Sequence, residues 1–329
     1  MYSEITMPKG FECAGIAAGI KAGGVRDMAL ILSNTPASSA GVFTSNQVCA
    51  APVKVCREHL KHGLARAIVM NSGIANACTG SAGMVAAKDM AAEAARIIDC
   101  EPQQIFVCST GKIGPQLPLE KIVPGIKALC EAAVCANVQQ TAEAMMTTDT
   151  RPKVAVAEFG VDGKAVKIVG FAKGAGMIEP NMATMLGFLA TDAVVSQDVM
   201  ATLAKDLADA SFNRVTIDGD TSTNDSFVVL ATNRAGNARI DSLASPAGKA
   251  LFEAMKIVAC QLAQAIVRDG EGATKFMTIQ VEGGATALEC RQAAYSIAHS
   301  PLVKTAFFAS DPNLGRILAA VGYAGIEDL

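Results

Sequence analysis

Short apolar segments with the length of buried strands alternate along this chain with longer segments whose apolar residues recur at helical spacing. Residues 67–70 form one strand-like segment, and the Ala-rich segment 83–99 has the period of a helix. Two further strand-like segments, 153–158 and 165–172, flank a turn that contains Gly and Asp, which is typical of a hairpin. Hairpins mixed with helices do not fit a doubly wound parallel sheet. The pattern therefore predicts an α+β architecture in which layered sheets are covered by helices.

The same reading assigns the other regular elements. The expected strands are 104–108, 184–191, 226–232, 275–282 and 302–309. The expected helices are 119–135, 196–212, 245–268, 285–298 and 313–321. We expect the first of these helices to be interrupted at Pro124-Gly125, because proline inside a helix removes a backbone hydrogen bond. No repeat of fixed period is present.

Composition excludes several classes of protein. At roughly 100–200 residues per domain, 329 residues suggest about two domains. A hydrophobic share of 51% with a net charge of −3 excludes a disordered chain. The mild acidity and the lack of a basic run argue against nucleic acid as the partner.

The sequence also argues against a membrane protein. The charge-free stretch 67–87 contains several Gly, Ser and Asn residues, so it resembles a loop and not a bilayer span of ~20 apolar residues. The first ten residues include Glu4, Pro8 and Lys9 and have no apolar core, unlike a signal peptide. We therefore expect a cytoplasmic protein with no membrane partner.

The cysteines and histidines give little support for a metal site or disulfides. None of the ten cysteines has C-x-x-C spacing, and only Cys56, His59 and His62 form a run with ligand-like spacing. Small buried cysteines in a reducing compartment are the simpler interpretation. A Cys-His nucleophile pair stays open as an alternative.

Glycine-rich turns follow two of the expected strands. The turn at 108–115 is not a P-loop, because Phe106 stands where that motif needs its first glycine and Ile113 follows Lys112. The turn at 173–180 lacks the third glycine of a dinucleotide-binding motif. Each could be a tight exit from a strand. Alternatively, backbone N–H groups in such turns form anion or oxyanion sites.

Two acidic loops invite a functional interpretation. DGDTSTND at 218–225 resembles a calcium loop, but Thr223 and Val229 stand where such a loop needs Gly and Glu. A hydrogen-bonded turn is the better interpretation. Glu271 lies between two glycines, and it is either a solvated loop acid or a ligand-binding carboxylate.

Three histidines do not assemble into a Ser-His-Asp set, so an acyl-transfer enzyme would need another base. An N-terminal threonine supplies one, because its own α-amino group has a pKa near ~7.7–8.0. Self-cleavage that releases such a threonine needs a small preceding residue and a following strand. The segment 181–186, NMATML, offers both, although Ala-Thr pairs are common.

The segment KGAGMIEPNMATMLGFLATDA, at 173–193, resembles the signature of the ornithine acetyltransferase family. The likeness covers nearly the whole chain in order. It includes GVFTSN (41–46), NSGIANACTG (71–80), CSTGKIG (108–114), MMTTDT (145–150), DGDTSTND (218–225), RDGEGATKF (268–276) and SDPNLGRI (310–317). Together these motifs are specific, whereas each alone is weak.

This resemblance implies a self-cleaving enzyme of arginine biosynthesis, a bifunctional glutamate N-acetyltransferase. It moves an acetyl group from N2-acetyl-L-ornithine to L-glutamate through an acetyl-threonine. The resemblance assigns the following residues: Thr184 as nucleophile, Ala183 and Thr184 as the cleavage site, Thr110 and Gly111 as the oxyanion hole, and Thr147, Lys173, Thr184 and Glu271 as the substrate site.

The resemblance also implies an α/β/β/α sandwich, divided by cleavage into an alpha chain, 1–183, and a beta chain, 184–329. Two alpha and two beta chains would assemble. The family uses no metal and no organic cofactor, and whether acetyl-CoA also serves as an acetyl donor stays open.

Two features depart from the family's pattern. Leu314 stands where the family carries an aromatic residue, and the family continues past Leu329 with a segment that supplies an Asn and a Thr or Ser to the substrate site. Either this sequence is a fragment of a longer chain, or the protein lacks part of that pocket. Two alternatives stay open, namely a self-processing aminopeptidase on a similar scaffold and a catalytically inactive binding subunit.

Overall fold

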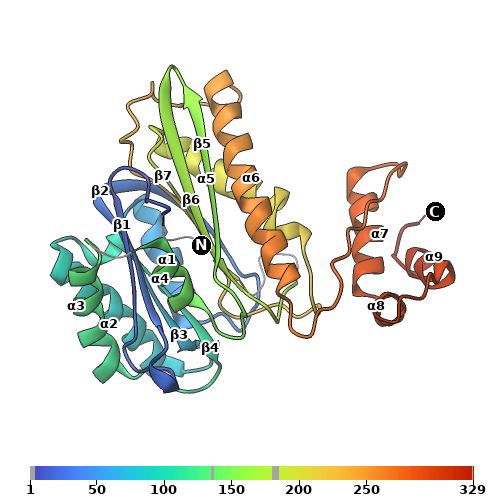
Figure 1. The fold of residues 1–329 in the computed structure, drawn as a ribbon, viewed down its shortest axis with the longest axis horizontal. Helices are drawn as coiled ribbons and strands as arrows, with labels where there is room; N and C mark the ends of the chain where they lie inside the picture. The colour runs from blue at the N-terminus through green and yellow to red at the C-terminus, as the bar shows by residue number, and fades with distance from the viewer. Residues whose placement is uncertain (1–3, 135–136, 180–184, 328) are drawn as a thin grey trace.

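The structure is a computed structural model that describes residues 4–134, 137–179, 185–327 and 329. Its strands form one eight-stranded mixed sheet in the order β4-β3-β2-β8-β7-β6-β5, with β1 paired to β2 (Figure 1). The strands are β1 (Phe11–Ile16), β2 (Met28–Phe43), β3 (Leu64–Ile74), β4 (Ile105–Lys112), β5 (Lys153–Val161), β6 (Lys164–Lys173), β7 (Leu186–Thr191) and β8 (Ser226–Ala231).

The long strand β2 connects the two parts of the sheet. Its first half pairs with β1 and β3, and a register shift between Leu32 and Ala37 separates it from the half that pairs with β8. The strands β3 and β4 are parallel, as are β7 and β8, while the β5–β6 hairpin is antiparallel. The carboxyl end of β6 and the amino ends of β7 and β8 therefore meet at one edge, since Lys173 pairs with Leu186 and Leu186 with Ser226.

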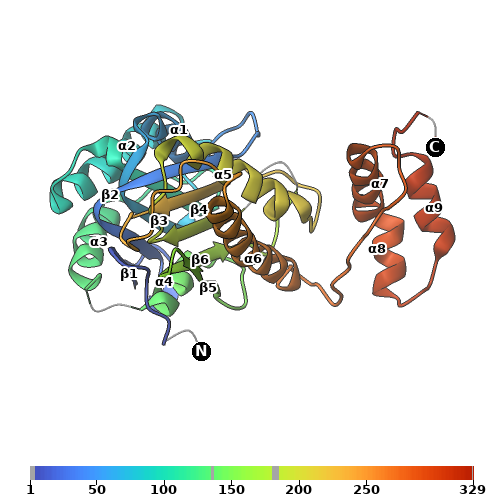
Figure 2. The same cartoon turned by 90° about the horizontal axis from the view of Figure 1, so that it is seen from above.

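Helices pack around this sheet, which confirms the predicted layered α+β architecture (Figure 2). The helices are α1 (Ala51–His59), α2 (Gly80–Ile98), α3 (Leu119–Ala132), α4 (Val138–Met145), α5 (Gln197–Ala210), α6 (Pro246–Arg268), α7 (Ala287–His299), α8 (Pro301–Phe308) and α9 (Leu314–Gly322). One hydrophobic core joins β1–β4 with α2–α4, and a second joins β7 and β8 with α5 and α6. The N-terminus of α5 begins as predicted, because the Ser196 side chain accepts a hydrogen bond from the Asp198 N–H.

Helix α6 has the length and apolar composition of a membrane span, and among the described residues it is the one helix that does. Its buried residues, which include Leu251, Val258 and Leu262, pack against the β5–β6 hairpin. A core helix of a soluble protein has this arrangement, so α6 is weak evidence for a membrane.

Two predicted strands are wrong. Residues 302–309 belong to helix α8 and its end, because Ser300 caps the N-terminus through Val303 N–H and Pro301 occupies the first helical turn. Residues 275–282 have no strand partner in the described chain. Two of their apolar side chains, Ile279 and Val281, pack instead against a small cluster formed by the last helices.

The predicted interruption of α3 is also wrong, since the helix continues through Pro124 to Ala132. The proline lies near the start of the helix, where its fixed φ suits a helix and the carbonyl that loses its partner belongs to the exposed Glu120. The next residue, Gly125, serves close packing, because a Cβ there would lie 2.5 Å from the sulfur of Met28 on β2.

Helices α7–α9 lie apart from the sheet and are joined to α6 by an extended segment (Figures 1 and 2). They contact the main body through the hydroxyl of Tyr295 and the ammonium of Lys304, which donate to the carbonyl oxygens of Asn213 and Ile217. A cavity of about 660 Å³ lies between these helices and the C-terminal half of α6.

Candidate active site

The predicted oxyanion residues and the predicted substrate-binding lysine lie together at the strand ends. Thr110 and Gly111 are near the carboxyl end of β4, and Lys173 is the last residue of β6. The Lys173 Nζ donates a hydrogen bond to Thr110 Oγ1 at 3.0 Å, although 63 residues separate the two in sequence. Both residues are buried, with 4% and 8% of their surfaces exposed. Burial lowers the pKa of Lys173, and the Asp149 carboxylate opposes that shift.

Gly111 cannot be replaced without moving the backbone. Its φ of +125° lies in a region that favours glycine, and a Cβ there would be 2.3 Å from the carbonyl carbon of Gly73. The strand end is therefore closely packed against β3. Gly111 itself is exposed, so this peptide is accessible at the edge of the site.

A buried cluster of three charged side chains adjoins the site. Lys153 Nζ lies 2.6 Å from Asp149 Oδ1 and 2.5 Å from Asp269 Oδ2, and the three side chains are at most 2% exposed. Burial raises the pKa of Asp149, but the ammonium groups of Lys173 and Lys153 outweigh that effect and hold it below its ordinary value. Burial also raises the pKa of Asp269, but Lys153 and Thr150 outweigh that effect and lower the pKa overall. Both carboxyl groups are therefore ionised at neutral pH.

Asp149 connects this cluster to the loops that carry the predicted substrate residues. Its Oδ1 accepts from Gly174 N–H at 2.7 Å, and its Oδ2 accepts from Thr147 N–H at 3.0 Å. Thr147 is half-buried, whereas the adjacent Thr148 is exposed. One carboxylate thus fixes the backbone beside Thr147 and beside Lys173.

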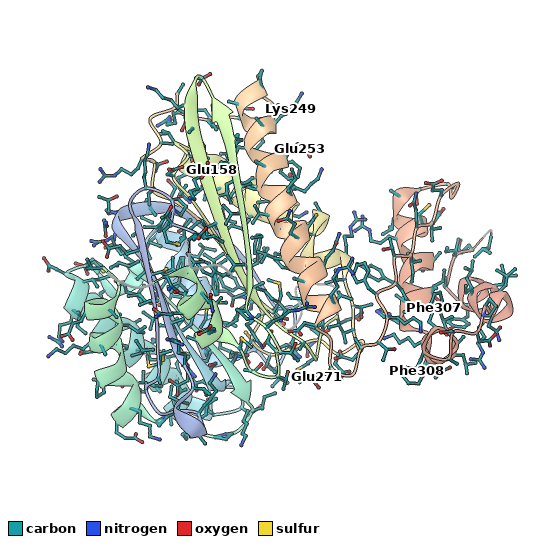
Figure 3. All side chains as sticks on the ribbon, viewed as in Figure 1. Glu158, Lys249, Glu253, Glu271, Phe307 and Phe308 are labelled. Atoms are coloured by element: carbon teal, nitrogen blue, oxygen red, sulfur yellow. The ribbon has the colours of Figure 1, made fainter. Side chains whose placement is uncertain are left out.

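Glu271 lies next to the same loop, just beyond α6 (Figure 3). Its N–H donates to Ala175 O at 2.7 Å, and its carboxylate is so close to Gly176 that a Cβ there would be 2.7 Å from Oε1. Glu271 is exposed and lines the 660 Å³ cavity, across which Phe307 and Phe308 also contribute to the lining. Thr110 and Lys173 do not line that cavity, so the cavity is not the predicted site as a whole.

The loop at 218–225 is structural, as predicted, and it also reaches the site. The Asp218 carboxylate accepts from the N–H groups of Met177 and Ile178. Asn224 donates to Ser109 O at 2.9 Å and so holds the backbone just before Thr110. Within the described ranges, no cluster of three or more His, Cys, Asp or Glu is placed to hold a metal ion.

The cysteine nucleophile left open by the sequence has no support in the structure. Cys56 is fully buried, its thiol donates to Val107 O, and His59 contacts Ile105 O at 2.7 Å. Burial raises the pKa of the Cys56 thiol well above its usual value. A buried thiol that stays protonated is unreactive.

Comparison with known proteins places this chain in a family. The model of the ArgJ family matches residues 12–328. This chain belongs to the ArgJ family. Two arginine biosynthesis bifunctional proteins ArgJ, from Neisseria meningitidis serogroups A and B, are each 52% identical to it over 315 residues, which is 95% of this chain and 76% of theirs. As an ArgJ protein, the chain is an acetyl-transferring enzyme of arginine biosynthesis.

Two solved structures resemble this chain in different ways. An ornithine acetyltransferase from Mycobacterium tuberculosis, solved with ornithine, is 38% identical over 53% of this chain and 93% of that chain, with a TM-score of 0.48. A Burkholderia β-aminopeptidase is 13% identical, covers 99% of this chain and 95% of that chain, and has a TM-score of 0.50. The second likeness concerns the fold alone. Family membership therefore decides between the two enzyme hypotheses in favour of ArgJ.

The sequence analysis missed the residues that support the candidate site. Asp149, Lys153, Asp269, Asn224 and Asp225 were given no role, although four of them lie inside the quoted motifs. A signal was present in the sequence, because charged residues next to buried strands are rarely buried without a partner of opposite charge. The predicted nucleophile Thr184 and its neighbour Ala183 lie outside the described residues, and the described chain resumes at Met185, the residue before β7.

Proposed function

We propose that this ArgJ protein transfers the acetyl group of N2-acetyl-L-ornithine to L-glutamate through an acetyl ester on Thr184. The observation that carries the proposal is the buried hydrogen bond from Lys173 to Thr110 at the end of β4. An ammonium group has three donors and no acceptor, so the Thr110 hydroxyl oxygen accepts the hydrogen bond from Lys173. The hydroxyl's own proton is therefore not donated to Lys173. That proton can be donated to an oxyanion, with Gly111 N–H as the second donor.

The proposed chemistry has two acetyl transfers. Thr184 Oγ1 forms a bond to the acetyl carbon while its α-amine takes the hydroxyl proton. The bond from the acetyl carbon to the ornithine nitrogen then breaks, and the proton goes to that leaving amine. In the second transfer the amine of glutamate attacks the acetyl carbon of the acetyl-threonine. The bond to Thr184 Oγ1 breaks, the proton returns to that oxygen, and acetylglutamate leaves. Incubation with acetyl-labelled acetylornithine and glutamate should give labelled acetylglutamate with ping-pong kinetics, and no transfer of label would reject the proposal.

Self-cleavage after Ala183 would precede this chemistry and is compatible with the fold. The cut would fall between β6 and β7, which pair from Ile168 with Thr191 to Lys173 with Leu186. The two resulting fragments would also share the pairing of β2 with β8. Noncovalent strand pairing would therefore keep the alpha and beta chains together after the peptide bond is broken.

The hydroxyl of Thr110 is expected to matter for rate more than for folding. Replacing Thr110 by alanine removes one oxyanion donor, and such a loss typically lowers kcat by about 10²- to 10³-fold. Thr110→Ser keeps the hydroxyl and is the matched control, which should retain most of kcat. The measurement is steady-state kinetics on correctly cleaved protein. A kcat near that of the parent in cleaved Thr110→Ala would reject the oxyanion role.

Charged groups at the site suit an amino-acid substrate with both signs of charge. Lys173 supplies a cation for a carboxylate, Glu271 an anion for an ammonium group, and Thr147 a hydroxyl nearby. Asp149 orders the backbone beside Thr147 and Lys173, and Glu271 is held against the same loop by its bond to Ala175 O.

Glu271 is expected to recognise the side-chain ammonium of ornithine. Glu271→Gln keeps the shape and removes the charge, so acetylornithine affinity should fall by about 10- to 150-fold, the equivalent of roughly 1.5–3 kcal/mol. Glutamate affinity should change far less, and cleavage should proceed. Glu282→Gln, an exposed acid outside the site, is the control. Equal binding of acetylornithine by Glu271→Gln and the parent would show that Glu271 is only a solvated loop acid and does not recognise the substrate.

The same proposal covers cofactors, assembly and location. We propose that no metal or organic cofactor takes part, that two alpha and two beta chains assemble, and that the enzyme works in the cytoplasm. Neither nucleic acid nor a membrane is a proposed partner. Whether acetyl-CoA is a second acetyl donor is decided by replacing acetylornithine with acetyl-CoA in the labelled assay.

A further inference from the structure

Lys21 is a half-buried cation beside the candidate site that the proposed chemistry does not use. It lies between β1 and β2, and its Nζ donates a hydrogen bond to Met146 O at 3.0 Å across 125 residues of sequence. Met146 directly precedes Thr147, a predicted substrate residue. The stem of Lys21 lies over Gly73 near the end of β3, where a Cβ would be 2.9 Å from Lys21 Cγ. Gly73 is in turn the residue against which Gly111 packs.

The loop that carries Lys21 is fixed by hydrogen bonds. The buried carboxylate of Asp27 accepts from three backbone N–H groups of this loop, including that of Lys21 at 2.8 Å. The carbonyl of Asp27 accepts from Ser72 N–H at 2.8 Å, which joins the loop to the end of β3. Burial lowers the pKa of the Lys21 ammonium, and the Asp27 and Asp149 carboxylates oppose that shift. Lys21 is therefore a positioned cation and not a loose surface side chain.

The Lys21 ammonium can form further hydrogen bonds. It has three donors, and Met146 O is the one partner of Nζ among the residues that the structure describes. Lys153, another cation near Thr147, differs in this respect, because it is enclosed between Asp149 and Asp269. Lys21 thus has donors to offer to an anion that these residues do not supply.

The two proposed substrates differ in the charge of their side chains. Acetylornithine has one carboxylate and a side-chain ammonium, which suit Lys173 and Glu271. Glutamate has the same α-carboxylate but carries a second carboxylate in its side chain, and Glu271 would repel that group. The second carboxylate therefore needs a cation away from Glu271. Glu271 donates to Ala175 O, whereas Lys21 contacts Met146 and the end of β3.

Resting on the proposed function, we propose that Lys21 determines acceptor specificity by binding the side-chain carboxylate of glutamate. The two donors that Met146 O does not use form charge-assisted hydrogen bonds with that carboxylate, while Lys173 binds the α-carboxylate. Lys21 makes and breaks no covalent bond. It contributes to binding of the acceptor and not to removal of the acetyl group from acetylornithine.

The test is a comparison of Lys21→Met with the parent in the two halves of the reaction, after intact mass has confirmed cleavage. The KM for glutamate should rise by about 10- to 100-fold, because a charge-assisted hydrogen bond is lost. Exchange of labelled ornithine into acetylornithine uses no glutamate and should continue near the parent's rate. Glutamine has the shape of glutamate without the side-chain charge. The ratio of kcat/KM for glutamate to that for glutamine should therefore fall by a similar factor.

Lys121→Met is the matched control, because Lys121 is exposed and donates to Gly19 O of the same loop at 2.7 Å. It should keep the parent's KM for glutamate, and Lys21→Arg, which keeps a cation, should retain most of the preference for glutamate. An unchanged preference in active Lys21→Met overturns the inference. An equal rise of KM for acetylornithine and glutamate also overturns it, because that result shows a structural role. Absence of ornithine exchange in the parent would instead overturn the proposed function.

A second measurement does not require a Lys21 variant to fold. Lysines of the cleaved parent are methylated with formaldehyde and borohydride, and mass spectrometry measures the extent at each residue. Saturating glutamate should protect Lys21 more than saturating glutamine does, and Lys121 should be modified equally in both. Equal modification of Lys21 with glutamate and with glutamine overturns the inference.

Discussion

Thr184→Ala is expected to accumulate as a single chain with no acetyl transfer. One hydroxyl is proposed to attack the Ala183 carbonyl during cleavage and the acetyl carbon during turnover, and alanine removes it. The parent should give fragments of 183 and 146 residues, whereas the variant should keep all 329. Intact mass on denatured protein measures the first effect, and the labelled acetyl-transfer assay measures the second.

Thr184→Ser is the matched control, because it keeps a hydroxyl and should still cleave. Cleavage of Thr184→Ala at the same bond would show that the Thr184 hydroxyl is not needed for processing. Acetyl transfer by an uncleaved Thr184→Ala chain would show that Thr184 is not the nucleophile of turnover. Because β6 and β7 pair across the proposed cut, both variants should retain the fold, which circular dichroism can verify.

Lys153→Met is expected to lower the free energy of unfolding by about 3–5 kcal/mol. Removal of one partner from a buried ion pair leaves an uncompensated buried charge, and here two carboxylates, Asp149 and Asp269, lose the same cation. Both have lowered pKa values in the folded chain. Their contribution is therefore present above the ordinary carboxyl range near pH ~4 and is lost as the pH falls below it. Urea unfolding at neutral pH measures the loss.

Lys256→Met is the control for this variant, because Lys256 forms an ion pair with Glu253 on the exposed face of α6. Exposed pairs of this kind contribute about 0–1 kcal/mol. A Lys153→Met chain as stable as the control would show that the buried cluster is not a source of stability. Because Asp149 also fixes Gly174, a rise in the KM for acetylornithine should accompany the loss of stability.

Local patterns in the sequence were enough to locate most elements. The β5–β6 hairpin and the capped helices α5 and α6 follow from alternation, turn residues and N-cap serines, which act over a few neighbouring residues. The predicted strands at 275–282 and 302–309 failed because a strand requires a partner that no local pattern specifies. Pro301 occupies the first turn of helix α8, and the short apolar run that follows it does not by itself distinguish a strand from a helix.

The motifs of the sequence by themselves determined the family and the identity of the residues at the candidate site, because they state which chemical groups are present in which order. The tertiary structure alone decided how those groups meet. It brings Lys173 within 3.0 Å of Thr110, and it buries Lys153 between Asp149 and Asp269. It also brings the Asp225 carboxylate within hydrogen-bonding distance of Met185 N–H, beside the start of β7. Apart from the pair of Lys153 and Asp149, these contacts join residues far apart in sequence. Their strength depends on burial, which only the packed sheet and its helices create.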